Sequence, residues 1–159
     1  MRGQIVLLIP LLVFTLFGVS SVAVDLREHR LPNGLTARLT FALVSSQILV
    51  SLLTSDWAVW SRILTTTVWV TSTYLALYLF SRGSLGFGDV KFALPCALVI
   101  GLYAPTQWLT ALWIAFGTAA LSALALLALG KAGRSSSLAF GPFMYLSVLI
   151  VAIKAIVSG

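Results

Sequence analysis

Long apolar segments alternate with short polar ones along almost the whole chain. Four segments are charge-free at residues 5–24, 39–55, 63–81 and 135–153, and a longer one covers residues 92–130. About 20 apolar residues suffice for a helix to cross a membrane, so residues 39–55 are the weakest of these segments. A helix over residues 92–130 would be about 58 Å long, and Pro105 interrupts it. The pattern therefore predicts an all-α membrane bundle of about six transmembrane helices.

Composition supports this assignment. Of 159 residues, 60% are hydrophobic and only 9% are charged, whereas soluble domains carry roughly 25% charged residues. No linker or low-complexity stretch divides the chain, which predicts one membrane-embedded domain over residues 1–159. The lone Cys96 excludes an intrachain disulfide and a multi-cysteine zinc site. The net charge of +6 comes from scattered residues, so no nucleic-acid partner is expected.

The basic residues predict how the bundle is oriented. Seven fall in the first, third and fifth connections: Arg27, Arg30, Arg38, Arg82, Lys91, Lys131 and Arg134. Three fall on the other side: Arg2, Arg62 and Lys154. The positive-inside rule then places the odd connections in the cytoplasm and both termini outside.

Residues 5–24 have a second interpretation. Arg2 precedes them, and the small residues at positions 21–23 resemble the cleavage site of a secretory signal. The apolar stretch is long for that purpose, since signal cores span about 7–15 residues. A retained transmembrane helix is therefore the favoured interpretation.

Acidic residues are few, and two of them border apolar segments. The chain has only Asp25, Glu28, Asp56 and Asp89. Asp25 follows the apolar segment at residues 5–24, and Asp89 precedes the one at residues 92–130. The predicted orientation puts both acids on the same side of the membrane. A carboxylate beside hydrocarbon is costly and is a functional candidate for that reason. Two structural alternatives stay open: Asp25 pairs with a nearby arginine, and Asp89 caps the following helix.

The residues around these acids suggest how each is presented. Pro32, followed by Asn33 and a glycine, predicts a turn after Asp25. Gly86 and Gly88 predict a loop before Asp89 that an extended substrate can approach closely. Helix dipoles favour Asp25, at a helix C-terminus, as the protonated acid, and Asp89, at a helix N-terminus, as the ionised one. Lys91 either biases the Asp89 carboxylate or anchors the chain at the cytoplasmic face.

Three motifs together resemble the type IV prepilin peptidases. They are Asp25 followed by residues 29–33 (His-Arg-Leu-Pro-Asn), residues 86–91 (Gly-Phe-Gly-Asp-Val-Lys), and residues 140–143 (Phe-Gly-Pro-Phe). In that family the two corresponding aspartates form the catalytic pair. The resemblance therefore implies Asp25 and Asp89 as catalytic residues. It also implies a substrate-binding or site-shaping role for a further set of residues: Pro32, Asn33, Gly86, Gly88, Lys91, Gly141 and Pro142. For Gly141 and Pro142 the expected role is a kink or a tight helix contact.

The resemblance also implies an activity. It predicts an aspartic endopeptidase of the bacterial inner membrane that removes the basic leader of type IV prepilins or pseudopilins at the cytoplasmic face. The expected partners are that substrate and membrane lipid, and no metal or organic cofactor is expected.

Some features limit what the resemblance implies. The chain has one cysteine and starts close to its first apolar segment, so it resembles the short branch that lacks the Cys-x-x-Cys extension and its methyltransferase activity. The alternatives are a preflagellin-type or other Gly-x-Gly-Asp membrane protease and, from another class, a small ion-coupled transporter. The particular pilin and the oligomeric state do not follow from the sequence.

Overall fold

A computed structural model describes residues 2–28, 32–81, 85–131 and 138–158. Within these ranges every regular element is helical. The elements are α1 (Arg2–Glu28), α2 (Asn33–Thr54), α3 (Val59–Phe80), α4 (Phe87–Tyr103), a short 3-10 helix η1 (Pro105–Gln107), α5 (Trp108–Ala128) and α6 (Gly141–Ser158). The predicted all-α bundle of about six helices is confirmed.

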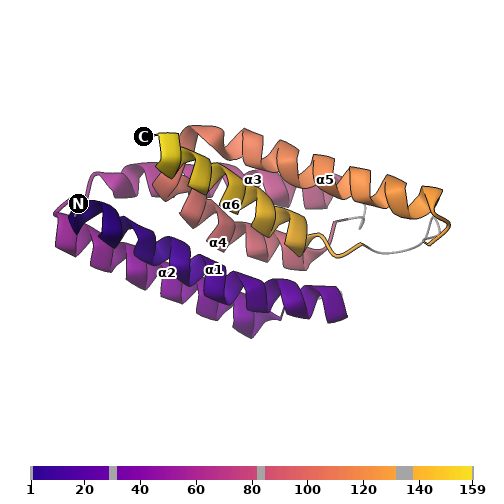
Figure 1. The fold of residues 1–159 in the computed structure, drawn as a ribbon, viewed down its shortest axis with the longest axis horizontal. Coiled ribbons are helices and arrows are strands. Elements are labelled where there is room, and N and C mark those ends of the chain that lie inside the picture. Colours follow the sequence, from indigo (N-terminus) through magenta and orange to yellow (C-terminus); the bar gives the residue numbers. More distant parts are fainter. Residues whose placement is uncertain (1, 29–31, 82–84, 132–137, 159) are drawn as a thin grey trace.

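Successive helices run back and forth, so the bundle has two distinct ends (Figure 1). Both chain termini lie at one end, together with the connections at residues 55–58 and 104–107; we call this the terminal end. The other end, which we call the aspartate end, holds the last turns of α1, α3 and α5 and the first turns of α2, α4 and α6. The described parts of the three sequence motifs therefore lie at a single end of the molecule.

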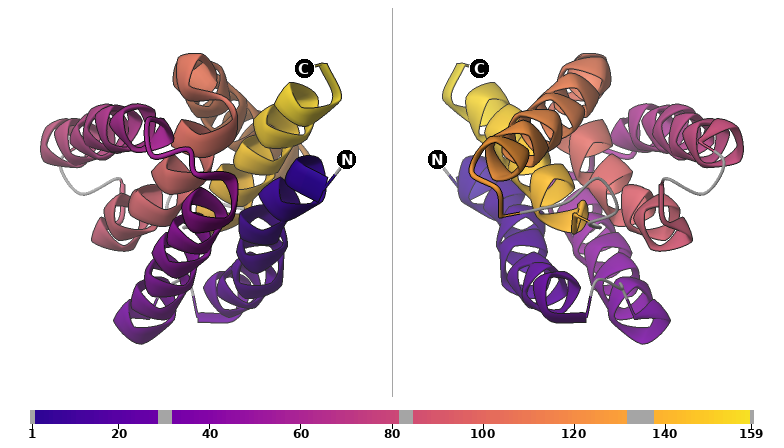
Figure 2. Two further views of the ribbon diagram at one scale, coloured as in Figure 1. Left: turned by 90° about the vertical axis from the view of Figure 1, so that its left-hand side faces the viewer. Right: turned by 90° about the vertical axis from the view of Figure 1, so that its right-hand side faces the viewer.

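Five of the described helical segments are long and apolar enough to cross a membrane. They are Val6–Arg27, Asn33–Thr54, Val59–Phe80, Pro105–Ala128 and Gly141–Ser158. The remaining helix, α4, has 17 residues and packs against α1, α2, α3, α5 and α6. The end-on views place it in the middle of the bundle (Figure 2), and most of its residues from Phe92 to Gly101 are buried.

The predicted break at Pro105 is confirmed, because α4 ends at Tyr103 and Pro105 starts η1. The predicted turn at Asn33 is wrong, because α2 begins there. Pro32 is its extended N-cap residue (φ −62°, ψ 133°), and its carbonyl accepts the N–H groups of Leu35 (3.1 Å) and Thr36 (3.2 Å). Proline is well suited to a helix start, since it lacks an N–H that would otherwise need a partner.

The last helix is also placed differently from the prediction. It begins at Gly141 and continues to Ser158, instead of covering residues 135–153. Residues 135–137 lie outside the described part of the chain, as do His29, Arg30, Arg82 and Arg134. Pro142 is the second residue of α6, where a missing N–H costs nothing, so it starts the helix and does not kink it.

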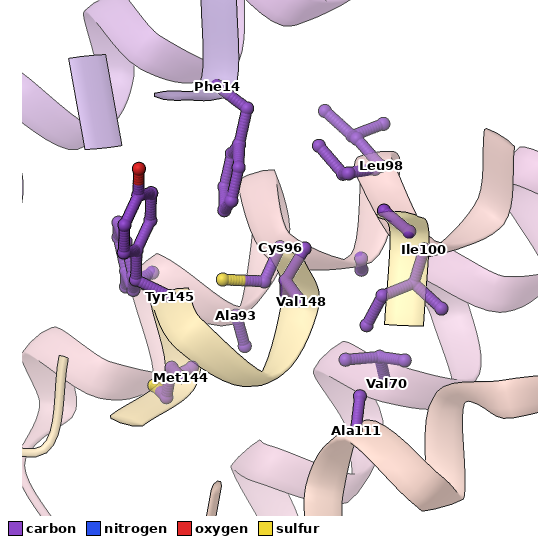
Figure 3. Packing of buried hydrophobic residues seen from close by; sticks show 14 of the residues in the cluster. Phe14, Val70, Ala93, Cys96, Leu98, Ile100, Ala111, Met144, Tyr145 and Val148 are labelled. Carbon is purple, nitrogen blue, oxygen red and sulfur yellow. The ribbon is translucent and has the colours of Figure 1, made fainter. Parts of the chain in front are cut away.

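Apolar side chains from α1, α3, α4, α5 and α6 meet in one buried cluster (Figure 3). Phe14 of α1 packs on Tyr145 of α6, with ring centroids 5.3 Å apart. The same tyrosine ring lies against Gly18, where any side chain would collide with it. Cys96 is buried in this cluster. These contacts hold α1 against α6 about two to three helical turns before Asp25.

A buried polar contact joins α2 to α4. The Gln47 side-chain amide donates to the carbonyl oxygen of Leu98 at 2.9 Å. Gln47 is 1% exposed, so the bond is shielded from water. Breaking such a bond leaves a buried polar group without a partner, which costs about 1–3 kcal/mol. The helix that carries Asp89 is thus fixed to its neighbours by specific contacts as well as apolar packing.

Candidate active site

Asp25 lies in the last turn of α1 and is almost completely buried, with 4% of its surface exposed. Its Oδ2 accepts a hydrogen bond of 2.9 Å from the backbone N–H of Gly141, which is 116 residues away in the sequence. Gly141 is the first residue of α6, so this N–H belongs to the positive end of a helix. The start of α6 therefore orients the Asp25 carboxylate and stabilises negative charge on it.

Gly141 must be glycine for this contact to form. A Cβ added at position 141 would lie 2.7 Å from Asp25 Oδ2 and 3.3 Å from Asp25 Cγ. The carboxylate occupies the space that a side chain would fill. Of the two roles expected for Gly141 and Pro142, a tight contact or a kink, the structure shows the tight contact at Gly141.

Asp89 lies in the first turn of α4, outside the five candidate spans. Its Oδ2 accepts the backbone N–H of Gly86 at 3.2 Å, and Gly86 is the N-cap residue of the helix. The structural alternative, that Asp89 caps α4, is therefore correct, although Asp89 caps from the third helical position. Gly88 lies inside the first turn, so the predicted loop ends at Gly86 and does not extend to Gly88.

The two acids influence one another although 64 positions separate them in the sequence. Burial, and next the negative charge of Asp25, raise the pKa of the Asp89 carboxyl from its usual value of 3.8 to about 6. The hydrogen bond from Gly86 acts in the opposite direction and is outweighed. A like charge raises the pKa of an acid only over a short range, so Asp25 and Asp89 lie within electrostatic range of each other at the aspartate end.

The expected division of labour between the acids is wrong for Asp89. Its pKa is raised, although its place at a helix N-terminus favoured the ionised form. Burial and the neighbouring Asp25 outweigh the effect of the helix dipole. Asp25, in turn, accepts a hydrogen bond from the N–H at the start of α6. The prediction considered only the dipole of α1 and did not include this contact. The structure thus makes Asp89 hold its proton more tightly than an ordinary carboxyl group, and it orients the Asp25 carboxylate by a helix-terminal N–H.

Lys91 connects the two motifs that flank the aspartates. Its Nζ donates to Asn33 Oδ1 at 2.7 Å, and it lies 4.7 Å from the centre of the Phe87 ring. Asn33 opens α2, directly after the connection from Asp25, while Lys91 lies two residues beyond Asp89. Lys91 therefore links the start of α2 to the first turn of α4. Pro32, the N-cap residue of α2, is exposed beside this link.

The sequence matches a protein family over nearly its whole length. The family is described as the type IV leader peptidase family, and the match covers residues 12–157. The chain belongs to the type IV leader peptidase family. The match includes Asp25, Asp89 and Gly141, the residues that the structure brings to the aspartate end. No curated protein and no solved structure is a significant match to the chain.

One residue near the site of this leader peptidase was not singled out from the sequence. Tyr74 of α3 is 4% exposed and lies within electrostatic range of Asp89. Its ring centroid is 6.2 Å from that of Phe116 on α5 and 6.5 Å from that of Phe140, which precedes Gly141. Tyr74 is one of many aromatic residues in apolar segments, so no sequence signal separates it from a lipid-facing residue. The fold turns it inward, where it packs with Phe116 and Phe140 in an aromatic cluster next to the start of α6.

Proposed function

We propose that this member of the leader peptidase family is an aspartic prepilin peptidase that uses Asp25 and Asp89 as its catalytic pair. The observation that carries the proposal is the effect of Asp25 on the pKa of Asp89 across 64 residues of sequence. An acid and a base with separated affinities for protons are what general acid–base hydrolysis requires.

The proposed reaction uses one water molecule between the two carboxyl groups. Asp25, ionised and oriented by Gly141, removes a proton from this water as its oxygen attacks the scissile carbonyl carbon. Asp89, protonated at the start of the reaction, donates its proton to the carbonyl oxygen. The tetrahedral intermediate then collapses: Asp25 gives its proton to the nitrogen, the C–N bond breaks and the amine leaves, while one hydroxyl of the intermediate returns a proton to Asp89 as the new carboxyl group forms.

The charge distribution supports a site at the cytoplasmic face of the bacterial inner membrane. Among the described residues, Arg27, Arg38, Lys91 and Lys131 lie at or near the aspartate end. Cytoplasmic connections of membrane proteins are enriched in such residues. The proposed substrates are type IV prepilins or pseudopilins, whose short basic leader precedes an apolar helix. The leader would lie in the aqueous cytoplasm near the two acids while the apolar helix stays in the bilayer.

Co-expression with a type IV prepilin tests this proposal. In cells without leader peptidase activity of their own, the wild-type chain should shorten the prepilin, and mass spectrometry should place the cut at the end of the basic leader. Asp25→Asn and Asp89→Asn should abolish processing at normal protein levels. Asp56→Asn is the matched control, because it removes the same charge at the terminal end and should leave processing intact.

Each remaining result has a clear meaning. Processing by either catalytic-site variant would refute the assignment of the aspartate pair. Cleavage of a preflagellin but no prepilin would reassign the substrate and retain the mechanism. If wild type leaves both substrates intact, the peptidase proposal fails for this chain and an ion-coupled transporter becomes the better interpretation.

A further inference from the structure

A groove lies at the terminal end, away from the two catalytic aspartates. It has a volume of about 320 Å³ and lies between the beginning of α3 and the segment formed by η1 and the beginning of α5. This volume falls at the lower end of small-molecule sites, which occupy roughly 300–1,000 Å³. Its lining, all within the described part of the chain, includes one cation, Arg62, and no acid.

The groove lies where two candidate membrane spans begin. These spans are Val59–Phe80 and Pro105–Ala128. Four of the five tryptophans of the chain occur at residues 57–60 or 108–113, near the terminal end, and Trp69 lies midway along α3. Tryptophan is enriched at the level of lipid headgroups. The tryptophans thus indicate that this part of the molecule lies at the membrane–water interface.

The groove walls combine charge with amphipathic rings. Arg62 is exposed and has the planar guanidinium group that binds phosphate oxygens in pairs. Trp69 and Trp108 flank the groove. Trp69 is 59% exposed, so most of its apolar ring is available to contact a bound molecule. Ser61 and Thr65 donate their hydroxyl hydrogens to the backbone carbonyls of Ala58 and Ser61, and Arg62 is the charged donor that the groove offers to a bound anion.

We propose that this groove binds the headgroup of one anionic phospholipid. The phosphate would accept hydrogen bonds from the Arg62 guanidinium. The glycerol and the upper part of the acyl chains would pack on the two tryptophan rings, continuing along the exposed apolar side chains of Leu109 and Trp113. A dissolved anion such as inorganic phosphate has no apolar part to pack on these rings, so a lipid fits the groove better. The site is independent of the proteolytic reaction.

Lipid titration of the purified protein, followed by native mass spectrometry, tests the proposal. Wild type should retain phosphatidylglycerol in preference to phosphatidylcholine. Arg62→Gln should weaken retention of phosphatidylglycerol by about five- to tenfold, as expected when one cation at a membrane surface is lost. Arg62→Lys keeps the charge but loses the fork-shaped donor, so it should retain an intermediate preference.

The control and competitor decide the result. Lys154→Gln removes an exposed cation at the same end of the bundle, on α6, and should leave the lipid preference unchanged. Equal losses in Arg62→Gln and Lys154→Gln would show a general attraction between charges and would overturn the proposed site. Displacement of the lipid by inorganic phosphate alone would also overturn it, because the occupant would then be a soluble anion.

Discussion

Replacing Gly141 with alanine should selectively disable the catalytic pair. The new Cβ would lie 2.7 Å from Asp25 Oδ2, so the carboxylate oxygen must retreat by about 0.7 Å to reach an ordinary van der Waals separation. The retreat also weakens the hydrogen bond that Gly141 donates at 2.9 Å. Misplacing a catalytic group by about 1 Å can cost roughly 100-fold in rate. We therefore expect kcat/KM to fall about 10- to 100-fold, or about 1.4–2.7 kcal/mol of transition-state stabilisation.

The assay is cleavage of a purified prepilin by purified enzyme in detergent micelles, with thermal unfolding measured on the same samples. The atom that must move is the end of a side chain, so the melting temperature should change little while the rate falls. Gly34→Ala is the matched control, since a Cβ at this first-turn position of α2 meets nothing within 4 Å. A wild-type rate in Gly141→Ala, or an equal loss in Gly34→Ala, would refute the proposed role of the α6 N-terminus.

Three further predictions concern the link, the pH dependence and the packing. Lys91→Met removes the hydrogen bond to the start of α2 and should slow cleavage about fivefold, whereas Lys131→Met should not; equal rates in the two variants would contradict the link. Cleavage should decline as pH rises above about 6, because the acid form of Asp89 is lost; a rate that is constant from acid to alkaline pH would contradict its role as proton donor. Gly18→Ala should lower stability by about 1–3 kcal/mol in chemical unfolding, since its side chain meets a packed tyrosine ring, while Gly117→Ala should not, because a Cβ there meets nothing within 4 Å.

The long apolar segments predicted much of this fold because membrane helices satisfy their backbone groups internally. The break at Pro105 and the shared end for Asp25 and Asp89 both followed from helix length and chain direction. Helix starts were less predictable. Asn33 belongs to α2 because the Pro32 carbonyl accepts the first N–H groups of the helix, and these bonds override the preference of Asn33 and Gly34 for a turn.

The chemistry of the site was predictable by residue type and less so by electrostatics. Asp25 and Asp89 stood out because acids are so rare in the chain. Their relative proton affinities depend on contacts between residues far apart in sequence, above all the Gly141 N–H on Asp25 and the effect of Asp25 on Asp89. Tyr74 shows the same limitation, because only the packing of α3, α5 and residue 140 brings it to the site.

The most direct test of the account is a pH titration of the Asp89 carboxyl by carbon-13 NMR, with its signal assigned by loss in Asp89→Asn. In wild type we expect an apparent pKa of about 6, shared by a coupled pair. In Asp25→Asn the pKa of Asp89 should fall, because a nearby negative charge is gone. Asp56→Asn should leave it unchanged. An Asp89 pKa that is the same in wild type and Asp25→Asn would show that the two acids do not act as a pair.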